Sequence, residues 1–244
     1  ALPRRRIATK ASHADMSVVS PRLLALATAV PPHALRQAAV RDHARAIFGN
    51  YAGEVERLAP VYGNSGVDTR YSCVPLDWYT ETHGWTDRNA LYLEHSVELL
   101  ARAATEALTE AGLGPRDIDA VVAVSTSGIA TPSLDALMID RLGLRDDIRR
   151  LPVFGLGCGG GVIGLGRASD LARAHPGERV LLLVVEPCGL TFRRSDGSTG
   201  NIVATALFGD GAAAAVISTE PSEAPRIGAS GEYTWPRSRD VMGW

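Results

Sequence analysis

Residues 120–125 read Ala-Val-Val-Ala-Val-Ser, five apolar side chains in a row. A strand exposed on one face alternates polar and apolar residues, so an unbroken run predicts a strand that is covered on both faces. In the preceding segment, apolar residues instead recur every three or four positions from Leu93 to Ala111. That spacing predicts an amphipathic helix over residues 87–111, ended by Gly112 and Gly114. A buried strand directly after a helix favours an α/β fold with a largely parallel, mixed sheet.

The same alternation continues along the chain. Apolar runs predict strands at residues 17–30, 150–156, 179–185 and 212–217, and periodic segments predict helices at residues 133–142, 158–174 and 201–207. The pattern is weaker near the N-terminus, where residues 37–58 favour a helix. The turn-rich and aromatic segment at residues 60–86 predicts irregular structure.

Composition excludes several classes of function. The 244-residue chain has a formal net charge of −2, which argues against a nucleic-acid-binding surface because such a surface needs clustered positive charge. No apolar run approaches the roughly 20 residues of a membrane-spanning helix. Lys10 is the only lysine, so Schiff-base chemistry, pyridoxal-phosphate anchoring and a P-loop are disfavoured.

The three cysteines, Cys73, Cys158 and Cys188, are widely spaced and contain no CxxC pair. This spacing indicates neither a disulfide framework nor a zinc site, and it predicts a protein of the reducing cytoplasm without a bound metal. Residues 1–16 are basic but lack a long apolar core, so we expect a flexible extension there and not a secretory signal. One domain is expected over residues 17–244.

The segment after Cys158 has no polar side chain over its first two turns, because residues 159–166 read GGGVIGLG. A helix that is apolar on every side is expected to be buried. Each glycine costs roughly 1 kcal/mol against alanine in a helix, so close packing against neighbours must require them. We therefore predict a buried central helix that starts at Cys158.

Cys158 is the strongest candidate for a functional side chain. A thiol at the N-terminus of a helix faces unpaired N–H groups and the positive end of the helix dipole, which favour the thiolate. Turns from strand to helix are also where open α/β sheets bind ligands. The alternative is an inert buried cysteine, which is the more common kind.

Residues 155–160 also read GLGCGG and so match the dinucleotide-binding pattern GxGxxG. An NAD-dependent oxidoreductase is therefore a competing hypothesis. Two features count against it: the loop follows earlier strands, and Glu186 lies later than the acidic residue of that fingerprint.

No histidine is a convincing base for Cys158, and His175 would lie roughly 25 Å away at the other end of the predicted helix.

Five segments together resemble the type III polyketide synthases, the chalcone synthase-like branch of the thiolase superfamily. These segments are GVDTRY at residues 66–71 with PLDWY at 75–79, STSG at 125–128 with Pro132, LGC at 156–158, EPCGLTFR at 186–193 and ALFGDGA at 206–212. Each piece alone is a weak signal, but their order and spacing together are specific. The resemblance runs from about residue 20 to the end and implies the N-terminal half of a thiolase-like fold.

The resemblance implies a role for each matching position. Cys158 would be the acyl-accepting nucleophile, and Phe208 would stand between a coenzyme A tunnel and the reaction cavity. Four further positions would line that cavity, and Thr131 would reach the partner subunit of a homodimer. Arg57 would contact coenzyme A, although Pro60 and Asn64 replace neighbouring basic residues. The cavity positions are Thr126, Glu186, Cys188 and Thr191.

By the same resemblance, the substrates would be an acyl-CoA starter and malonyl-CoA, joined by decarboxylative Claisen condensation without a metal or redox cofactor. The product would be a polyketide, with an alkylpyrone or alkylresorcinol as one possibility. The family's catalytic histidine and asparagine belong to a second half that residues 1–244 do not include, so we expect this chain alone to be inactive in condensation. An initiating ketoacyl-ACP synthase-like enzyme and a truncated, non-catalytic partner subunit remain alternatives.

Overall fold

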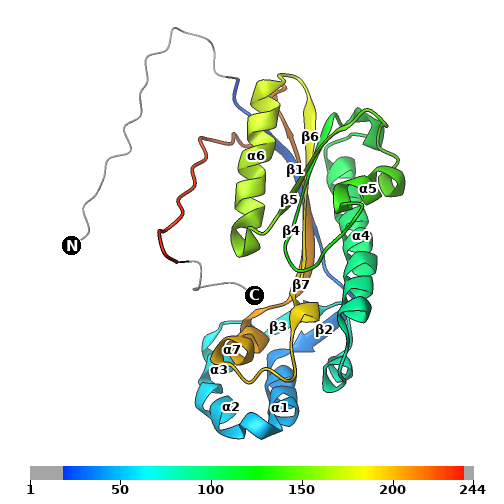
Figure 1. Ribbon diagram of the computed structural model, residues 1–244. Helices are drawn as coiled ribbons and strands as arrows, with labels where there is room; N and C mark the ends of the chain where they lie inside the picture. Colours follow the sequence, from blue (N-terminus) through cyan, green and yellow to red (C-terminus); the bar gives the residue numbers. More distant parts are fainter. Residues whose placement is uncertain (1–18, 239–244) are drawn as a thin grey trace, which may run out of the picture.

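The computed structural model describes residues 19–238 and consists of an upper lobe built on a sheet and a smaller lower lobe (Figure 1). The expected extension at residues 1–16 lies outside the described residues. The sheet has the strand order β1-β7-β6-β4-β5. Its strands are β1 (Arg22–Ala29), β4 (Ala120–Ser125), β5 (Arg149–Phe154), β6 (Arg179–Pro187) and β7 (Asp210–Ser218).

The sheet is mixed, as expected, but it is less parallel than the sequence suggested. β4 pairs in parallel with β5 and β6, whereas β7 pairs antiparallel with both β6 and β1. The strand at residues 212–217 follows only a short helix and a tight turn, which gives the antiparallel return along β6. Strands β6, β4 and β5 therefore form the parallel part of the sheet.

Helices cover both faces of the sheet, which explains the unbroken apolar run of β4, buried at all six positions. On one face lie α4 (Trp85–Glu110) and α5 (Leu134–Leu142), whose apolar side chains pack on β1, β4, β6 and β7. On the other face lies α6 (Gly160–Ala174), packed on Val122, Val124 and Leu182. The strands and helices predicted between residues 87 and 217 are confirmed within a few residues of their ends.

The lower lobe holds a third apolar cluster around Phe48, Val55 and Ile202. It is built from α1 (Gln37–Ile47), η1 (Gly49–Tyr51), α2 (Ala52–Leu58), α3 (Pro60–Asn64) and α7 (Thr199–Leu207), beside a two-stranded sheet of β2 (His33–Arg36) and β3 (Thr69–Ser72). The prediction of irregular structure over residues 60–86 was wrong in part, since that segment contains α3, β3 and the 3-10 turn η2 (Leu76–Thr80). The turn η3 (Pro115–Asp117) leads into β4.

The expectation of a buried helix starting at Cys158 is corrected in two ways. Cys158 lies in the 3-10 turn η4 (Gly157–Gly159), and α6 begins at Gly160. The helix is buried only where it meets the sheet: a Cβ at Gly164 would lie 2.7 Å from Val124 Cγ2, whereas Val162 on the opposite side is 78% exposed. The glycines thus allow close packing on β4, as expected, while the far side of α6 is left open.

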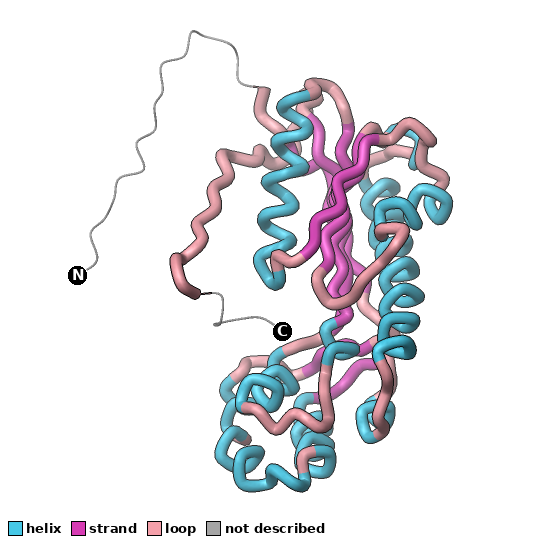
Figure 2. Tube along the Cα trace, in the orientation of Figure 1, coloured by secondary structure: helices cyan, strands magenta, loops and turns pink. Residues whose placement is uncertain are grey.

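The segment after β7 runs back beside α6 as an extended stretch (Figure 2). Arg173 on α6 donates to the carbonyl oxygen of Gly228 at 2.8 Å, and Arg167 bonds Glu232. Among residues 19–238, no helix has both the length and the apolar character needed to cross a membrane.

Candidate active site

Three parallel strands end at the same edge of the sheet, and the candidate residues follow them directly. Thr126 follows β4, Cys158 lies four residues after β5, and Glu186 is near the end of β6. The carboxyl ends of parallel strands are the usual binding edge of an open α/β sheet. The turn η5 (Cys188–Thr191) continues from β6 at this edge and places two further candidates there.

The turn that carries Cys158 is shaped by glycine and held by Thr126. Gly155 and Gly157 adopt φ values of +82° and +55°, a conformation that side chains with a Cβ rarely adopt. The backbone N–H of Gly157 donates to Thr126 Oγ1 at 3.1 Å, which links this turn to the end of β4. Cys158 is exposed, so its sulfur can be reached from outside the chain.

Glu186 is oriented by the segment after β4. Its Oε2 accepts hydrogen bonds from the backbone N–H and the hydroxyl of Ser127, at 3.0 and 2.6 Å. Its Oε1 is buried and has no hydrogen-bond partner among the described residues. Two strand ends, those of β4 and β6, are therefore tied together by one carboxylate beside the cysteine turn.

Cys188 is the second thiol of the site. Burial, and after it the negative charges of Glu186 and Asp210, raise its pKa to about 12. At neutral pH Cys188 is a protonated thiol, so it acts as a lining residue and not as a competing nucleophile.

A cavity of about 110 Å³ lies between the lower lobe and the turn η5. Three predicted site residues, Cys188, Thr191 and Phe208, line it together with apolar side chains of α1. Phe208 is 36% exposed, and its carbonyl oxygen accepts a hydrogen bond of 3.2 Å from Arg70 Nη1. Cys188 lines this cavity, whereas Cys158, Thr126 and Glu186 do not.

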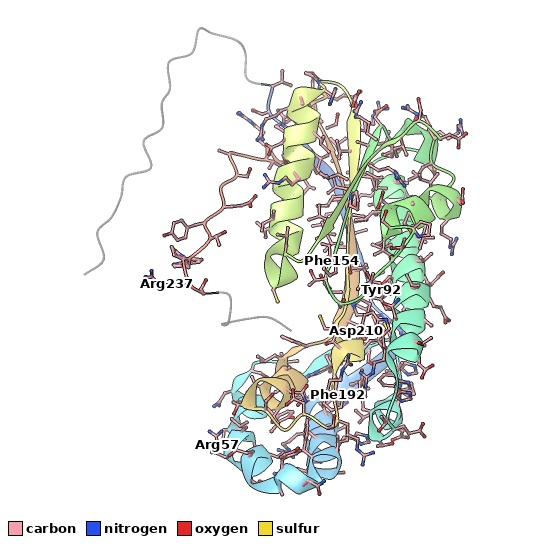
Figure 3. The ribbon with its side chains drawn as sticks, viewed as in Figure 1. Arg57, Tyr92, Phe154, Phe192, Asp210 and Arg237 are labelled. Carbon is pink, nitrogen blue, oxygen red and sulfur yellow. The ribbon has the colours of Figure 1, made fainter. Side chains whose placement is uncertain are left out.

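Asp210 was not singled out as a site residue in the sequence, yet it organises the junction between the two lobes (Figure 3). Its carboxylate accepts from the backbone N–H of Gly189 at 2.6 Å and from that of Cys73 at 2.7 Å. Burial raises the pKa of Asp210. Burial and the neighbouring charge of Asp210 raise the pKa of the Cys73 thiol. Cys73 is therefore an inert structural cysteine.

Arg70 was missed in the same way. Its guanidinium is buried and bonds the carbonyl oxygens of Thr205 and Ala206 at the end of α7, as well as Gln37 Oε1. A signal was available for both residues, since Arg70 belongs to the GVDTRY segment and Asp210 to ALFGDGA. In each segment a charged side chain stands among glycines or apolar residues, which is itself a signal of a buried, hydrogen-bonded charge.

Two predicted site residues lie apart from this group. Arg57 is on α2 at the far end of the lower lobe, where its guanidinium pairs with Glu54 at 2.5 Å (Figure 3). That hydrogen bond lowers the pKa of Glu54 and raises that of Arg57. Thr131 is exposed on the loop between β4 and α5, and neither residue lines the cavity.

The dinucleotide hypothesis does not fit the sheet. The GLGCGG loop follows β5, which is the edge strand next to β4 in the described chain, whereas a dinucleotide lies across a crevice between two strands where their order reverses. His175 caps the far end of α6, as expected. Within residues 19–238, no group of three or more His, Cys, Asp and Glu side chains is placed to hold a metal ion.

A cysteine at a strand-to-helix turn, at the carboxyl edge of a mixed sheet, is an arrangement that suits enzymes forming covalent intermediates through sulfur. Residues 8–221 match the N-terminal domain of chalcone and stilbene synthases. The match covers most of the chain, which therefore belongs to the chalcone and stilbene synthase family, the type III polyketide synthases.

Individual relatives agree with this assignment. The chain is 38% identical to a 1,3,6,8-tetrahydroxynaphthalene synthase of Streptomyces peucetius subsp. caesius over 225 residues, which are 90% of this chain and 59% of that protein. It is 32% identical to a putative chalcone synthase of Bacillus subtilis, over 91% of this chain and 64% of that protein.

Among solved structures, the 1,3,6,8-tetrahydroxynaphthalene synthase of Streptomyces coelicolor, a bacterial type III polyketide synthase, superposes with a TM-score of 0.85 at 30% identity. The superposition covers 90% of this chain and 63% of that structure. The thiolase-like α/β fold is thereby confirmed. The chain spans about three fifths of the length of these relatives.

Proposed function

We propose that this chain supplies the acyl-accepting cysteine and one wall of the reaction cavity of a type III polyketide synthase. The observation that carries the proposal is the exposed thiol of Cys158 on a turn held by Thr126, at the edge of the sheet from which Cys188, Thr191 and Phe208 line a cavity that Cys158 itself does not line. Family membership supports the reaction type. The exposure of Cys158 supports its assignment as the nucleophile.

The first step is a thioester exchange. The Cys158 thiolate attacks the carbonyl carbon of an acyl-CoA, the carbon–sulfur bond to coenzyme A breaks, and coenzyme A leaves as its thiolate. One thioester replaces another, so the step needs no oxidant, reductant or external energy source. Sulfur suits this exchange because a thiolate is both a good nucleophile and a good leaving group.

Extension follows from the same chemistry. Malonyl-CoA loses carbon dioxide, and the resulting carbanion attacks the acyl group on Cys158, which forms a carbon–carbon bond and frees the cysteine sulfur. In the family, a histidine and an asparagine stabilise the developing enolate through hydrogen bonds, in the manner of an oxyanion hole. We propose acyl-CoA and malonyl-CoA as substrates, without a metal or redox cofactor.

The other assignments carried by the resemblance are part of the same proposal. Arg57 would contact coenzyme A and Thr131 would face a partner subunit in a homodimer, which the exposure of both side chains permits. The open side of α6 around Val162 supports a further packing partner there, since exposed apolar side chains on a helix commonly mark interfaces. We propose a cytoplasmic location, on the basis of the cysteine usage.

Coenzyme A release tests this function against the dinucleotide alternative. The chain is mixed with hexanoyl-CoA, and free coenzyme A is measured by mass spectrometry before and after treatment of the protein with iodoacetamide. We expect a burst of about one coenzyme A per chain, abolished by alkylation. Quenching of intrinsic fluorescence by NAD⁺ without any such burst would reject the proposal.

A further inference from the structure

Arg88, in the first turn of α4, carries a buried positive charge that the proposed function does not use. Arg88 is 7% exposed and forms no ion pair with any carboxylate among residues 19–238. Burial lowers its pKa, and the nearby positive charge of Arg193 lowers it further. A buried charge is costly unless hydrogen bonds compensate for its lost water, so its partners indicate what it does.

Those partners are carbonyl oxygens and an aromatic face. Nη1 donates to the carbonyl oxygen of Leu190 at 2.9 Å and to that of Phe192, and Nε donates to the carbonyl oxygen of His83 at 2.9 Å. The guanidinium carbon lies 5.4 Å from the centre of the Trp78 ring. Two of the three carbonyls belong to η5 and the residue after it, which is the turn that brings Cys188 and Thr191 to the cavity.

The same turn is held from its other side by Asp210. The N–H of Gly189 donates to Asp210 Oδ1 at 2.6 Å, and Thr191 Oγ1 donates to the carbonyl oxygen of Cys188 at 2.7 Å. An anion therefore binds an N–H group of the turn, while a cation binds its carbonyl groups. This arrangement fixes a short segment that has no regular secondary structure to stabilise it beyond one 3-10 turn.

We propose that Arg88 is a positioning residue that, together with Asp210, sets the Cys188–Thr191 turn and thereby the exposure of the half-buried Cys188 thiol. The planar guanidinium of Arg88 donates hydrogen bonds in several fixed directions at once, which a lysine ammonium on a flexible side chain does not reproduce. Loss of Arg88 frees the carbonyls of Leu190 and Phe192 and lets the turn move away from the cavity. The effect of this movement on the space open to a growing polyketide chain rests on the proposed function. The predicted change in the exposure of Cys188 does not rest on it.

Thiol mapping tests this role on Arg88→Met, Arg88→Lys and a matched control, Arg102→Met. Arg102 is on the same helix and also donates to a backbone carbonyl, that of Val30 at 3.1 Å, but it is exposed. Each protein is treated with N-ethylmaleimide at pH 8, and the alkylation rates of Cys188 and Cys158 are followed by peptide mass spectrometry. We expect the Cys188 rate to rise about tenfold or more in Arg88→Met, with Arg88→Lys in between, and Arg102→Met to match the parent.

The alkylation rate of Cys73, followed alongside the other two, separates positioning from general loosening, because unfolding would expose the buried Cys73 as well. An unchanged Cys188 rate in folded Arg88→Met overturns the proposal. If Arg88→Met does not fold, Arg88→Lys decides, since a rate equal to the parent's overturns the proposal and a raised rate supports it. Acyl transfer from hexanoyl-CoA to Cys158 is measured on portions of the same proteins that have not been alkylated. Failure of the proposed function is then seen independently of the alkylation rate of Cys188.

Discussion

Thr126 Oγ1 accepts a hydrogen bond of 3.1 Å from the backbone N–H of Gly157, the residue before Cys158. This contact joins the end of β4 to the turn after β5, across the edge of the sheet where the candidate site lies. The hydroxyl of Thr126 thus acts through the backbone on the position of the sulfur. Its role is more specific than that of a small residue filling space.

Thr126→Val removes the acceptor while keeping the shape of the side chain. We expect the free energy of unfolding to fall by about 1 kcal/mol, the usual net value of one hydrogen bond, and the alkylation of Cys158 to slow or quicken by about threefold or more as the turn shifts. Urea unfolding and iodoacetamide kinetics measure the two effects. Thr126→Ser keeps the acceptor and serves as the control, and equal Cys158 kinetics in all three proteins would contradict this role.

The close approach of α6 to the sheet predicts opposite effects for two neighbouring glycines. A Cβ at Gly164 would lie 2.7 Å from Val124 Cγ2 and 3.1 Å from Leu182 Cδ1, whereas one at Gly161 would lie 3.8 Å from Val184 Cγ1. We expect Gly164→Ala to destabilise the fold by about 1–3 kcal/mol through overpacking. Gly161→Ala should be neutral or stabilising by up to about 1 kcal/mol, because alanine favours helix.

Urea unfolding of the two variants provides this test, with each one serving as the other's control. Equal stability of Gly164→Ala and Gly161→Ala would show that α6 does not pack against β4 as described.

The alkylation of the Cys188 thiol should depend steeply on pH. The pKa of Cys188 is raised to about 12, so its thiolate fraction, and with it its alkylation rate, should rise about tenfold for each pH unit from pH 7 to 10 without levelling off. Peptide mass spectrometry after short pulses of iodoacetamide measures this profile. A plateau for Cys188 below pH 10 would show that the thiol is neither buried nor surrounded by negative charge.

Arg57 allows a test of the coenzyme A assignment. We expect Arg57→Gln to weaken binding of free coenzyme A by about threefold to tenfold, a modest effect because the site is exposed and screened by salt. Glu54→Gln removes the partner of the ion pair and leaves the cation available, so it should bind at least as well as the parent. Isothermal titration calorimetry measures both, and equal affinity of Arg57→Gln and the parent would remove Arg57 from the site.

The upper lobe could be predicted from sequence because its signals are local. The periodicity from Leu93 to Ala111 and the apolar run of β4 each specify one element without reference to distant residues. β3 could not be found in this way, because it exists by pairing with β2, more than 30 residues earlier in the chain. Its four residues carry no alternation that separates them from a loop.

The site was predicted in part, for a similar reason. Cys158 was marked by its place between a strand and a glycine-rich segment, and Cys188, Thr191 and Phe208 by resemblance to a family. Arg88 and Asp210 were missed because their roles arise from partners on other elements, in particular the carbonyl and N–H groups of one turn. The burial of α6 was overestimated, because an apolar sequence shows what can be buried and not what is present to cover it.

The central claim is that Cys158 accepts the acyl group, and intact-protein mass spectrometry after incubation with hexanoyl-CoA tests it most directly. Cys158→Ala and Cys188→Ala form a matched pair, since each removes one of the two thiols of the site. The account predicts one added hexanoyl group on the parent and on Cys188→Ala, and none on Cys158→Ala. An acyl group retained by Cys158→Ala, or mapped to Cys188 in the parent, would contradict it.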